Sequence, residues 1–197
     1  MGVPERRIDR RDLMTMEDYG RIRQEKRRAI SELKKNRRLA IGPFATLYFE
    51  SYDTMWMQIH EMLYVERGGE DQIAGELAAY NPLIPQGNEI IATLMFEIDD
   101  PARRSAELQR LGGVEHTVGL RIASERIVAT IIGEEERTRD DGKTSAVHFF
   151  RFVMDDRQVA LFKDQANEAM FSVTHPNYGH LAMIPAGVRQ ALIGDLS

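Results

Sequence analysis

The spacing of apolar residues changes several times along the chain, and each change marks the end of one predicted element and the start of another. Near the N-terminus one apolar seam recurs at helical spacing, formed by Tyr19, Ile22, Ile30 and Leu33. The seam predicts a highly charged amphipathic helix over about 16–35, beginning at a capping box that starts with Thr15. Because the seam is narrow, we expect this helix to pack across a larger body or a partner.

The rest of the chain predicts short strands and helices in irregular alternation. Strands are expected over about 39–49, 89–98, 114–122, 126–132, 144–153 and 170–174. Helices are expected over about 54–67, from there to Tyr80, after Asp100-Pro101, from Asp155 to about Asn167, and from about Pro185. Since at least one strand pair reads as a hairpin, the pattern predicts an α+β fold with a mixed or mostly antiparallel sheet flanked by helices.

Charge divides the chain into two unlike parts. The whole sequence has 26 Lys and Arg against 31 Asp and Glu, a net charge of −5. Residues 1–38 contain 13 of the basic residues and 7 acidic ones, so their balance is +6 and that of the remainder is −11. The division predicts a basic helical arm over 1–38 and a single α+β domain over 39–197.

Several classes of protein are excluded or disfavoured by what the sequence lacks. It has no cysteine, which rules out disulfides, Cys-ligated zinc and thiol nucleophiles. No signal-peptide core and no apolar run of membrane-spanning length is present, so we expect a cytoplasmic protein. The phosphate-binding glycine motifs and the hydrolase elbow are also missing, and His60-Glu61 lacks the second histidine of a zincin, because Tyr64 stands in its place.

A carboxylate and a histidine at apolar positions are the first candidates for chemistry. Glu66 falls within the apolar arc of the helix over 54–67, and His148 lies inside a strand that is apolar on both faces, together with Arg151. Glu66 could be a metal ligand or general base, or it could form an ion pair, with Arg151 as the natural partner, or reach solvent at the helix end. His148 could be a ligand or a core histidine with one hydrogen bond.

The turn from His175 to His180 could bring two imidazoles together as half of a metal site, or it could be a plain surface turn. Carboxylates elsewhere would complete such a site. The predicted metal ligands are Glu50, Glu61, Glu66, His148 and His175, and the metal would be a divalent ion such as iron, zinc or manganese.

A small-ligand pocket is the third candidate. Such a pocket, beside the proline-rich loop, could be lined by Tyr48, Tyr52 and Tyr80 with Asn81, although these could equally be half-buried aromatic residues without a ligand. Gln58 and Arg151 are expected to support the metal or to bind an anion. The predicted ligand-binding residues are therefore Gln58, Tyr80, Asn81 and Arg151.

The basic segment over 34–38 would suit phosphates, but seven acids are mixed into residues 1–38 and the rest of the chain is acidic. Nucleic acid is therefore a weak expectation. Docking of this segment on the acidic body of its own or a twin subunit explains the same charges better, and we expect a homo-oligomer.

Several segments together resemble a bacterial family of unknown function, domain of unknown function 3501. The matching segments are Lys35-Asn36-Arg37-Arg38-Leu39 with Gly42-Pro43, Ala45 to Glu50, Thr54 with Gln58, Glu61-Met62 and Glu66-Arg67, Tyr80 to Pro85, Thr144 to Phe149 with Arg151-Phe152, and His175-Pro176. The family has no established activity. Its members are often encoded beside a rubrerythrin-like protein and an iron–sulfur oxidoreductase, so the resemblance implies a redox or peroxide-defence partner.

Two functional hypotheses follow from these observations. In the first, the protein is an accessory of a cytoplasmic redox system, with a pocket of histidine and carboxylate groups that holds a metal or small ligand. In the second, it is a non-catalytic homodimeric adaptor whose basic helix docks a partner and whose buried Glu and Arg residues are structural ion pairs. An enzyme without a recognised motif is a third reading.

Overall fold

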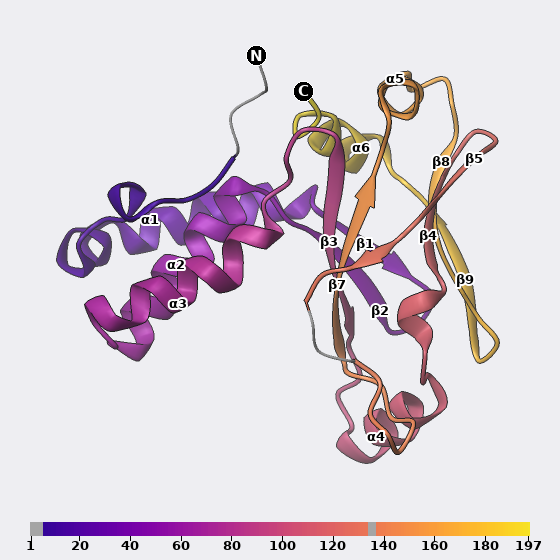
Figure 1. Ribbon diagram of the computed structural model, residues 1–197, viewed down its shortest axis with the longest axis horizontal. Coiled ribbons are helices and arrows are strands. Elements are labelled where there is room, and N and C mark those ends of the chain that lie inside the picture. The colour runs from indigo at the N-terminus through magenta and orange to yellow at the C-terminus, as the bar shows by residue number, and fades with distance from the viewer. Residues whose placement is uncertain (1–5, 134–136) are drawn as a thin grey trace.

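The computed structural model describes residues 6–133 and 137–197, and its fold has three layers: helices, a first sheet and a second sheet (Figure 1). The first sheet has the order β1-β2-β3-β7-β6, with β1 (Arg38–Ile41), β2 (Ala45–Phe49), β3 (Glu89–Phe96), β7 (Val147–Val153) and β6 (Thr130–Ile131). The second has the order β5-β4-β8-β9, with β5 (Glu125–Val128), β4 (Val118–Ile122), β8 (Ala169–His175) and β9 (Tyr178–Met183). Every strand pair in these ranges is antiparallel, and the predicted α+β class is confirmed.

Six α-helices accompany the sheets in the part of the chain that the structure describes. They are α1 (Met16–Lys35), α2 (Tyr52–Glu66), α3 (Glu70–Tyr80), α4 (Pro101–Arg110), α5 (Asp156–Lys163) and α6 (Ala186–Ile193). Helices α1, α2 and α3 gather on the side of the first sheet that faces away from the second sheet (Figure 1). None of the described helices has both the length and the apolar character needed to cross a membrane.

The N-terminal caps predicted from the sequence are present at α1, α4 and α5. Thr15, Asp100 and Asp155 each accept a hydrogen bond from the backbone N–H three residues later, at the first turns of α1, α4 and α5. Helix α2 begins earlier than predicted, because Ser51 and Thr54 form a capping box. Helix α5 ends at Lys163, earlier than the predicted Asn167.

Residues 39–49, predicted as one strand with an edge or a bend at Gly42-Pro43, form two strands instead, because the chain turns back there and forms the hairpin of β1 and β2. Gly42 has a φ of 73°, which a residue with a Cβ adopts only under strain. A Cβ at Gly42 would also lie 2.6 Å from the His180 ring. The glycine therefore allows both the tight turn and the close approach of β9.

Two hydrophobic cores hold the layers together. The larger lies between the two sheets and contains aromatic side chains from both, among them Phe49, Phe150, Phe152 and Phe171. The smaller lies between the first sheet and the helices and contains Ile59, Leu63, Ile84 and Ile91. The first sheet is therefore covered on both faces, as the apolar pattern of residues 147–153 indicates.

Residues 6–14, here called the N-terminal strap, also belong to the smaller core. Ile8 is fully buried, and the Asn81 side chain accepts a hydrogen bond from its N–H (2.7 Å) and donates one to its carbonyl (3.0 Å). Trp56 Nε1 donates to the Asp12 carbonyl (2.9 Å), and His60 Nε2 accepts from the Met14 N–H (3.1 Å). The basic arm predicted over 1–38 thus packs closely on α2 and α3, while its boundary stays a prediction and its residues 1–5 lie outside the described ranges.

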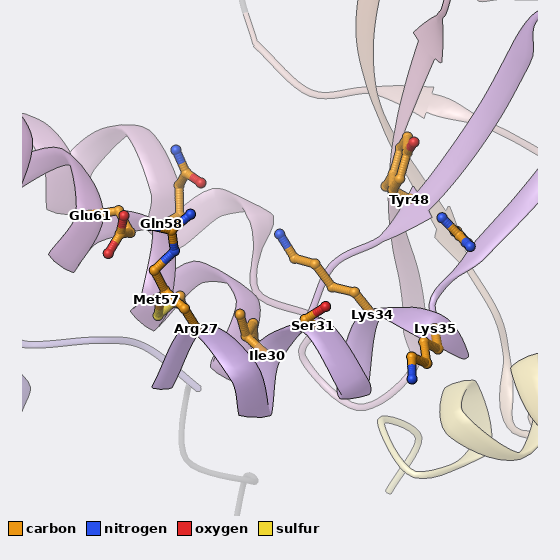
Figure 2. A pocket seen from close by; sticks show the side chains of 10 residues that line it. Arg27, Ile30, Ser31, Lys34, Lys35, Tyr48, Met57, Gln58 and Glu61 are labelled. Carbon is orange, nitrogen blue, oxygen red and sulfur yellow. The ribbon is translucent and has the colours of Figure 1, made fainter. Parts of the chain in front are cut away.

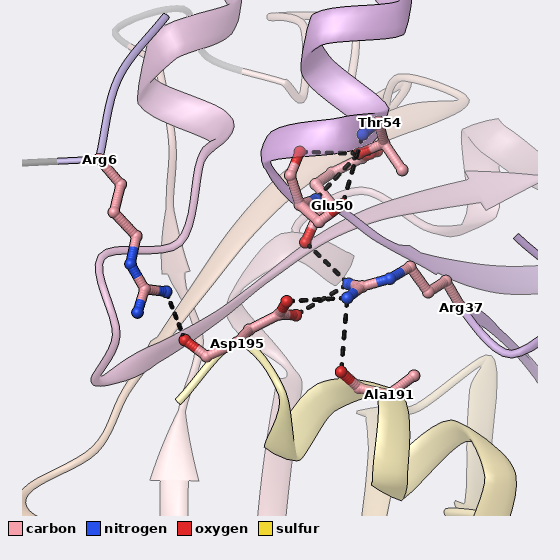
Figure 3. A network of polar contacts seen from close by, with 7 residues as sticks. Arg6, Arg37, Glu50, Thr54, Ala191 and Asp195 are labelled. Carbon is pink, nitrogen blue, oxygen red and sulfur yellow. Dashed lines mark hydrogen bonds and ion pairs between the residues drawn. The ribbon is translucent and has the colours of Figure 1, made fainter. Parts of the chain in front are cut away.

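The two ends of the described chain meet in a network of polar contacts (Figure 3). The Arg37 guanidinium donates to both carboxylate oxygens of Asp195, at 2.8 Å each. It also lies within 3.4 Å of the Glu50 and Ala191 carbonyl oxygens. Arg6 donates to the Asp195 carbonyl (2.6 Å), so the strap, β1 and the segment after α6 share one centre.

Replacing Asn81 by alanine is expected to lower the free energy of unfolding by about 2 kcal/mol or more, because the Ile8 N–H and carbonyl lose their partners while Ile8 stays buried. Urea unfolding monitored by circular dichroism measures the change. Asn36→Ala is the matched control, since the Asn36 side chain is exposed, and its effect should stay within about 0.5 kcal/mol. Equal stability of the two variants would contradict the role of Asn81 in holding the strap.

Candidate functional site

The candidate site is a groove with a volume of about 480 Å³ between α1, α2 and the start of the first sheet (Figure 2). It is lined by Arg27, Ile30, Ser31, Lys34, Lys35, Arg38, Tyr48, Met57, Gln58 and Glu61. We call it the basic groove, because four of these side chains are cationic. Lys34 extends from α1 into the space between Gln58 of α2 and Tyr48 of β2 (Figure 2).

Helical spacing explains why the cations share one side of the groove. Arg27, Ser31 and Lys34 lie four and seven residues apart on α1, so their side chains follow one face of the helix. The helix ends at Lys35 and β1 begins at Arg38, which brings a further cation to the same side. Met57, which is buried, supplies apolar surface from α2.

Three of the four cations have no ionic partner. Lys35 pairs with Glu32 along the helix (2.6 Å), whereas Arg27, Lys34 and Arg38 form no ion pair with any residue in 6–133 or 137–197. Clustered cations without counter-charges repel one another, and an anion bound among them relieves that repulsion. The groove is therefore a favourable place for negative charge.

An ion pair closes one end of the basic groove. Arg23 binds Glu61 through both carboxylate oxygens at 2.8 Å, and the Tyr19 hydroxyl donates to Glu61 Oε1 at 2.6 Å. The Arg23 hydrogen bond, with that of Tyr19, lowers the pKa of Glu61 to about 2 despite partial burial. Burial and the contact with Glu61 raise the pKa of Tyr19. Glu61 is therefore ionised at neutral pH, and both of its oxygens already accept hydrogen bonds.

A second hollow of about 750 Å³ adjoins the groove and shares Lys35, Arg38 and Tyr48 with it. It continues past the start of α6, where Pro185, Gly187 and Val188 line it. Here the Glu97 carboxylate accepts hydrogen bonds from Thr46 (2.7 Å) and Tyr48 (2.6 Å), and the latter contact raises the pKa of Tyr48. We call the two hollows together the channel; its lining includes the unpaired cations and one carboxylate in each hollow, Glu61 in the first and Glu97 in the second.

The predicted carboxylate ligands lie at separate places. Glu50 accepts hydrogen bonds from the Thr54 (2.8 Å) and Thr93 (2.7 Å) hydroxyls, and Glu61 is bound by Arg23. Glu66 is exposed at the end of α2 and accepts from Gln72 (2.7 Å), as in the alternative in which this acid reaches solvent.

The two predicted histidine ligands likewise form hydrogen bonds with other parts of the fold. His148 is fully buried, stacks on Phe150, and has Nε2 at 2.9 Å from the Ser145 carbonyl. His175 has Nε2 at 3.2 Å from the Gly112 carbonyl, and its Nδ1 accepts from the Asn177 N–H. No group of three or more His, Asp and Glu side chains that could hold a metal ion occurs among the described residues. The metal site stays a prediction. In this structure its five predicted ligands do not converge on one point.

The predicted ligand-binding residues fall into two places. Gln58 lines the basic groove and donates to the Tyr80 hydroxyl (3.4 Å). Asn81 and Arg151 line another hollow of about 540 Å³, but Asn81 holds the strap. The expected pairing of Arg151 with Glu66 is wrong: Arg151 pairs with Glu89 (3.2 Å), which lies diagonally across from it on β3 and is almost completely buried.

Sequence reasoning singled out the cations at 34–38 and Tyr48 but did not connect them as a site. Arg27 and Ser31 were missed. A usable signal exists in the spacing of Arg27, Ser31 and Lys34, which marks one polar helix face whose cations have no acid three or four residues away. The opposing wall from α2 and β2 has no such local signal, because it depends on how the helices pack.

The chain belongs to a family described as a protein of unknown function (DUF3501), whose model matches residues 7–196. It is also similar to a crystal structure of a novel protein of unknown function from Burkholderia pseudomallei K96243. The two have a TM-score of 0.88 and 38% sequence identity, covering 96% of this chain and 99% of the other. A comparison with curated proteins finds no match. The predicted family membership is confirmed, and it brings no activity with it.

The buried histidines predict how stability depends on pH. Burial lowers the pKa of both His60 and His148 below the ordinary value. Below about pH 6.5 the unfolded chain therefore binds more protons than the folded chain, and the free energy of unfolding should fall as the pH is lowered from 7 to 5. Each histidine contributes at most about 1.4 kcal/mol per pH unit.

Urea unfolding at several pH values measures this dependence. His60→Gln and His148→Gln should each reduce the slope of stability against pH, whatever they do to stability at pH 7. His116→Gln is the control, because His116 is exposed, and it should leave the slope unchanged. A slope that is the same in all three variants would contradict the assignment.

Proposed function

We propose that this protein is a non-catalytic adaptor whose basic groove binds an acidic segment of a partner protein. The observation that supports this most directly is the row of unpaired cations, Arg27, Lys34 and Arg38, along one wall of an open channel. Charge-assisted contacts of these cations with Asp and Glu side chains would supply both attraction and orientation.

The shape of the site favours a polypeptide over a small molecule. Small-molecule pockets are mostly enclosed and apolar, with a few polar groups that fix the ligand. Here two open hollows of about 480 and 750 Å³ run into one another and share Lys35, Arg38 and Tyr48. An extended segment can follow such a channel and present several carboxylates to it.

The carboxylates of the channel favour acidic protein over nucleic acid. Glu61 lines the first hollow and Glu97 the second, and their carboxylates would repel a continuous phosphate backbone. A peptide can place uncharged residues there and its acids beside the cations. Tyr48, the channel's aromatic residue, has its hydroxyl tied to Glu97, which disfavours a base-stacking role.

The pairing of the buried charges also supports an adaptor. Arg37 binds Asp195, Arg23 binds Glu61 and Arg151 binds Glu89. The charged groups of these three pairs bind one another and are not directed at a common point where a metal or substrate would bind. A redox protein, which the family resemblance implies as partner, is compatible with this binding mode, and a cytoplasmic location remains part of the proposal.

Fluorescence anisotropy with a labelled oligoglutamate peptide tests the proposal. The wild-type chain should bind at low salt, and Lys34→Glu with Arg38→Glu should weaken binding about tenfold or more, because two attractive contacts become repulsive. The matched control is Arg121→Glu with Arg126→Glu, which changes the net charge equally on the exposed face of the second sheet. That variant should bind within about twofold of wild type.

Three results would overturn the proposal. The first is no binding by the wild type at low salt, and the second is an equal loss in both double variants, which would reflect net charge alone. The third is tighter binding of a single-stranded oligonucleotide of equal charge, with the same dependence on Lys34 and Arg38, because the groove would then be a nucleic-acid site.

A further inference from the structure

Strand β9 differs from the other strands that end the two sheets. Edge strands expose unpaired backbone N–H and C=O groups, and proteins that stay monomeric protect them with charge, proline or short length. At the other edges β6 has two residues, β1 begins with Arg38, and β5 contains Glu125 and Arg126. Strand β9 has six residues, Tyr-Gly-His-Leu-Ala-Met, with no acidic residue, no Lys or Arg and no proline.

The outer side of β9 is open toward the end of the strand. Its backbone pairs with β8 alone among the strands described, and it lies at the outer margin of the fold in Figure 1. Its first half lies against the β1–β2 hairpin, where the buried Tyr178 donates to the Ile41 carbonyl (2.6 Å) and the His180 ring lies close to Gly42. Further along, Leu181 is 66% and Met183 47% exposed. A strand with free backbone groups and exposed apolar side chains is a template for another strand.

We propose that β9 pairs antiparallel with β9 of a second copy of this chain, across a twofold axis, and joins the two four-stranded sheets into one. The lack of charged residues around β9 favours a second copy over an acidic or basic partner. Beside β9, the residues of β8 on the same outer face are Met170, Ser172 and Thr174, which are uncharged. A charged partner would therefore gain no ionic contact here, whereas two identical neutral strands meet without repulsion.

A twofold axis makes the two strands complementary to each other. In a twofold pair each strand offers the same backbone pattern to the other, so all contacts occur twice. Leu181 and Met183 then pack against the same residues of the second copy and are removed from water. The interface is independent of the proposed adaptor function, because the basic groove is built from α1, α2, β1 and β2.

The absence of cysteine allows a direct test of this geometry. In an antiparallel twofold pair, the axis can pass through a residue position, and that residue then lies opposite its own copy with Cα atoms about 4.5–5.5 Å apart, within disulfide range. If the axis passes between two adjacent residues, each of them lies opposite the other residue of the second copy. Single cysteines at positions 179 to 183 should therefore form disulfide-linked dimers under mild oxidation at one position, or else a pair of cysteines at two adjacent positions should do so, and the other variants should stay unlinked. Val128→Cys, on the edge strand β5, is the control and should stay unlinked.

Sedimentation velocity of the full chain gives an independent readout. The wild type should sediment as a dimer in a concentration-dependent manner, and Leu181→Lys should shift it to a monomer with an unchanged circular dichroism spectrum. Val128→Lys should remain dimeric. If Leu181→Lys fails to fold, Met183→Lys replaces it. A wild type that is monomeric at all concentrations, or a dimer that withstands the lysine substitution and gives no cross-link along β9, overturns the proposal.

Discussion

Arg37 and Asp195 form the ion pair on which the placement of the surrounding elements depends (Figure 3). Their side chains are only 9% and 14% exposed, so removal of either partner would leave a charge in a poorly hydrated place, at a cost of several kcal/mol. The pair joins the residue between α1 and β1 to the segment after α6, and the same guanidinium reaches the Glu50 carbonyl just before α2. It therefore ties the end of α1 to the segment after α6 and to the residue before α2, and the basic groove lies between α1 and α2.

The distribution of charge follows from the same free-energy cost of burying an ion. Charged groups that the fold removes from water have partners, as Glu61 has Arg23 and Glu89 has Arg151. Charges without partners, such as Arg27 and Lys34, remain at the surface, where hydration makes this inexpensive. The unpaired groups are thus the ones available to a partner molecule, whereas the buried groups stabilise the fold. For this reason the site residues that were predicted from buried positions differ from the exposed residues that line the basic groove.

Much of the fold could be predicted from local signals. The caps at Thr15, Asp100 and Asp155 depend on residues a few positions apart, and the structure has helices there. The hairpin at Gly42 was predicted as one strand, although Gly42-Pro43 is a local turn signal and Gly42 has a φ of 73°. For the site, the cations of α1 could be found from spacing, but Glu66 was misjudged. Its position in the apolar arc indicated burial, whereas α2 extends past the core at that end and leaves the carboxylate exposed.

The amino-acid sequence by itself determined the α+β class, the charged N-terminal helix, the absence of any thiol chemistry and the family. These features depend on composition and on contacts between near neighbours in the chain. Only the tertiary structure decided which charges are paired and which are free. Arg37 meets Asp195 from a distance of 158 residues, and Arg23 meets Glu61 across two helices. Such pairings are selected by the packing of whole layers, because the free energy of a buried ion depends on what the folded chain places next to it.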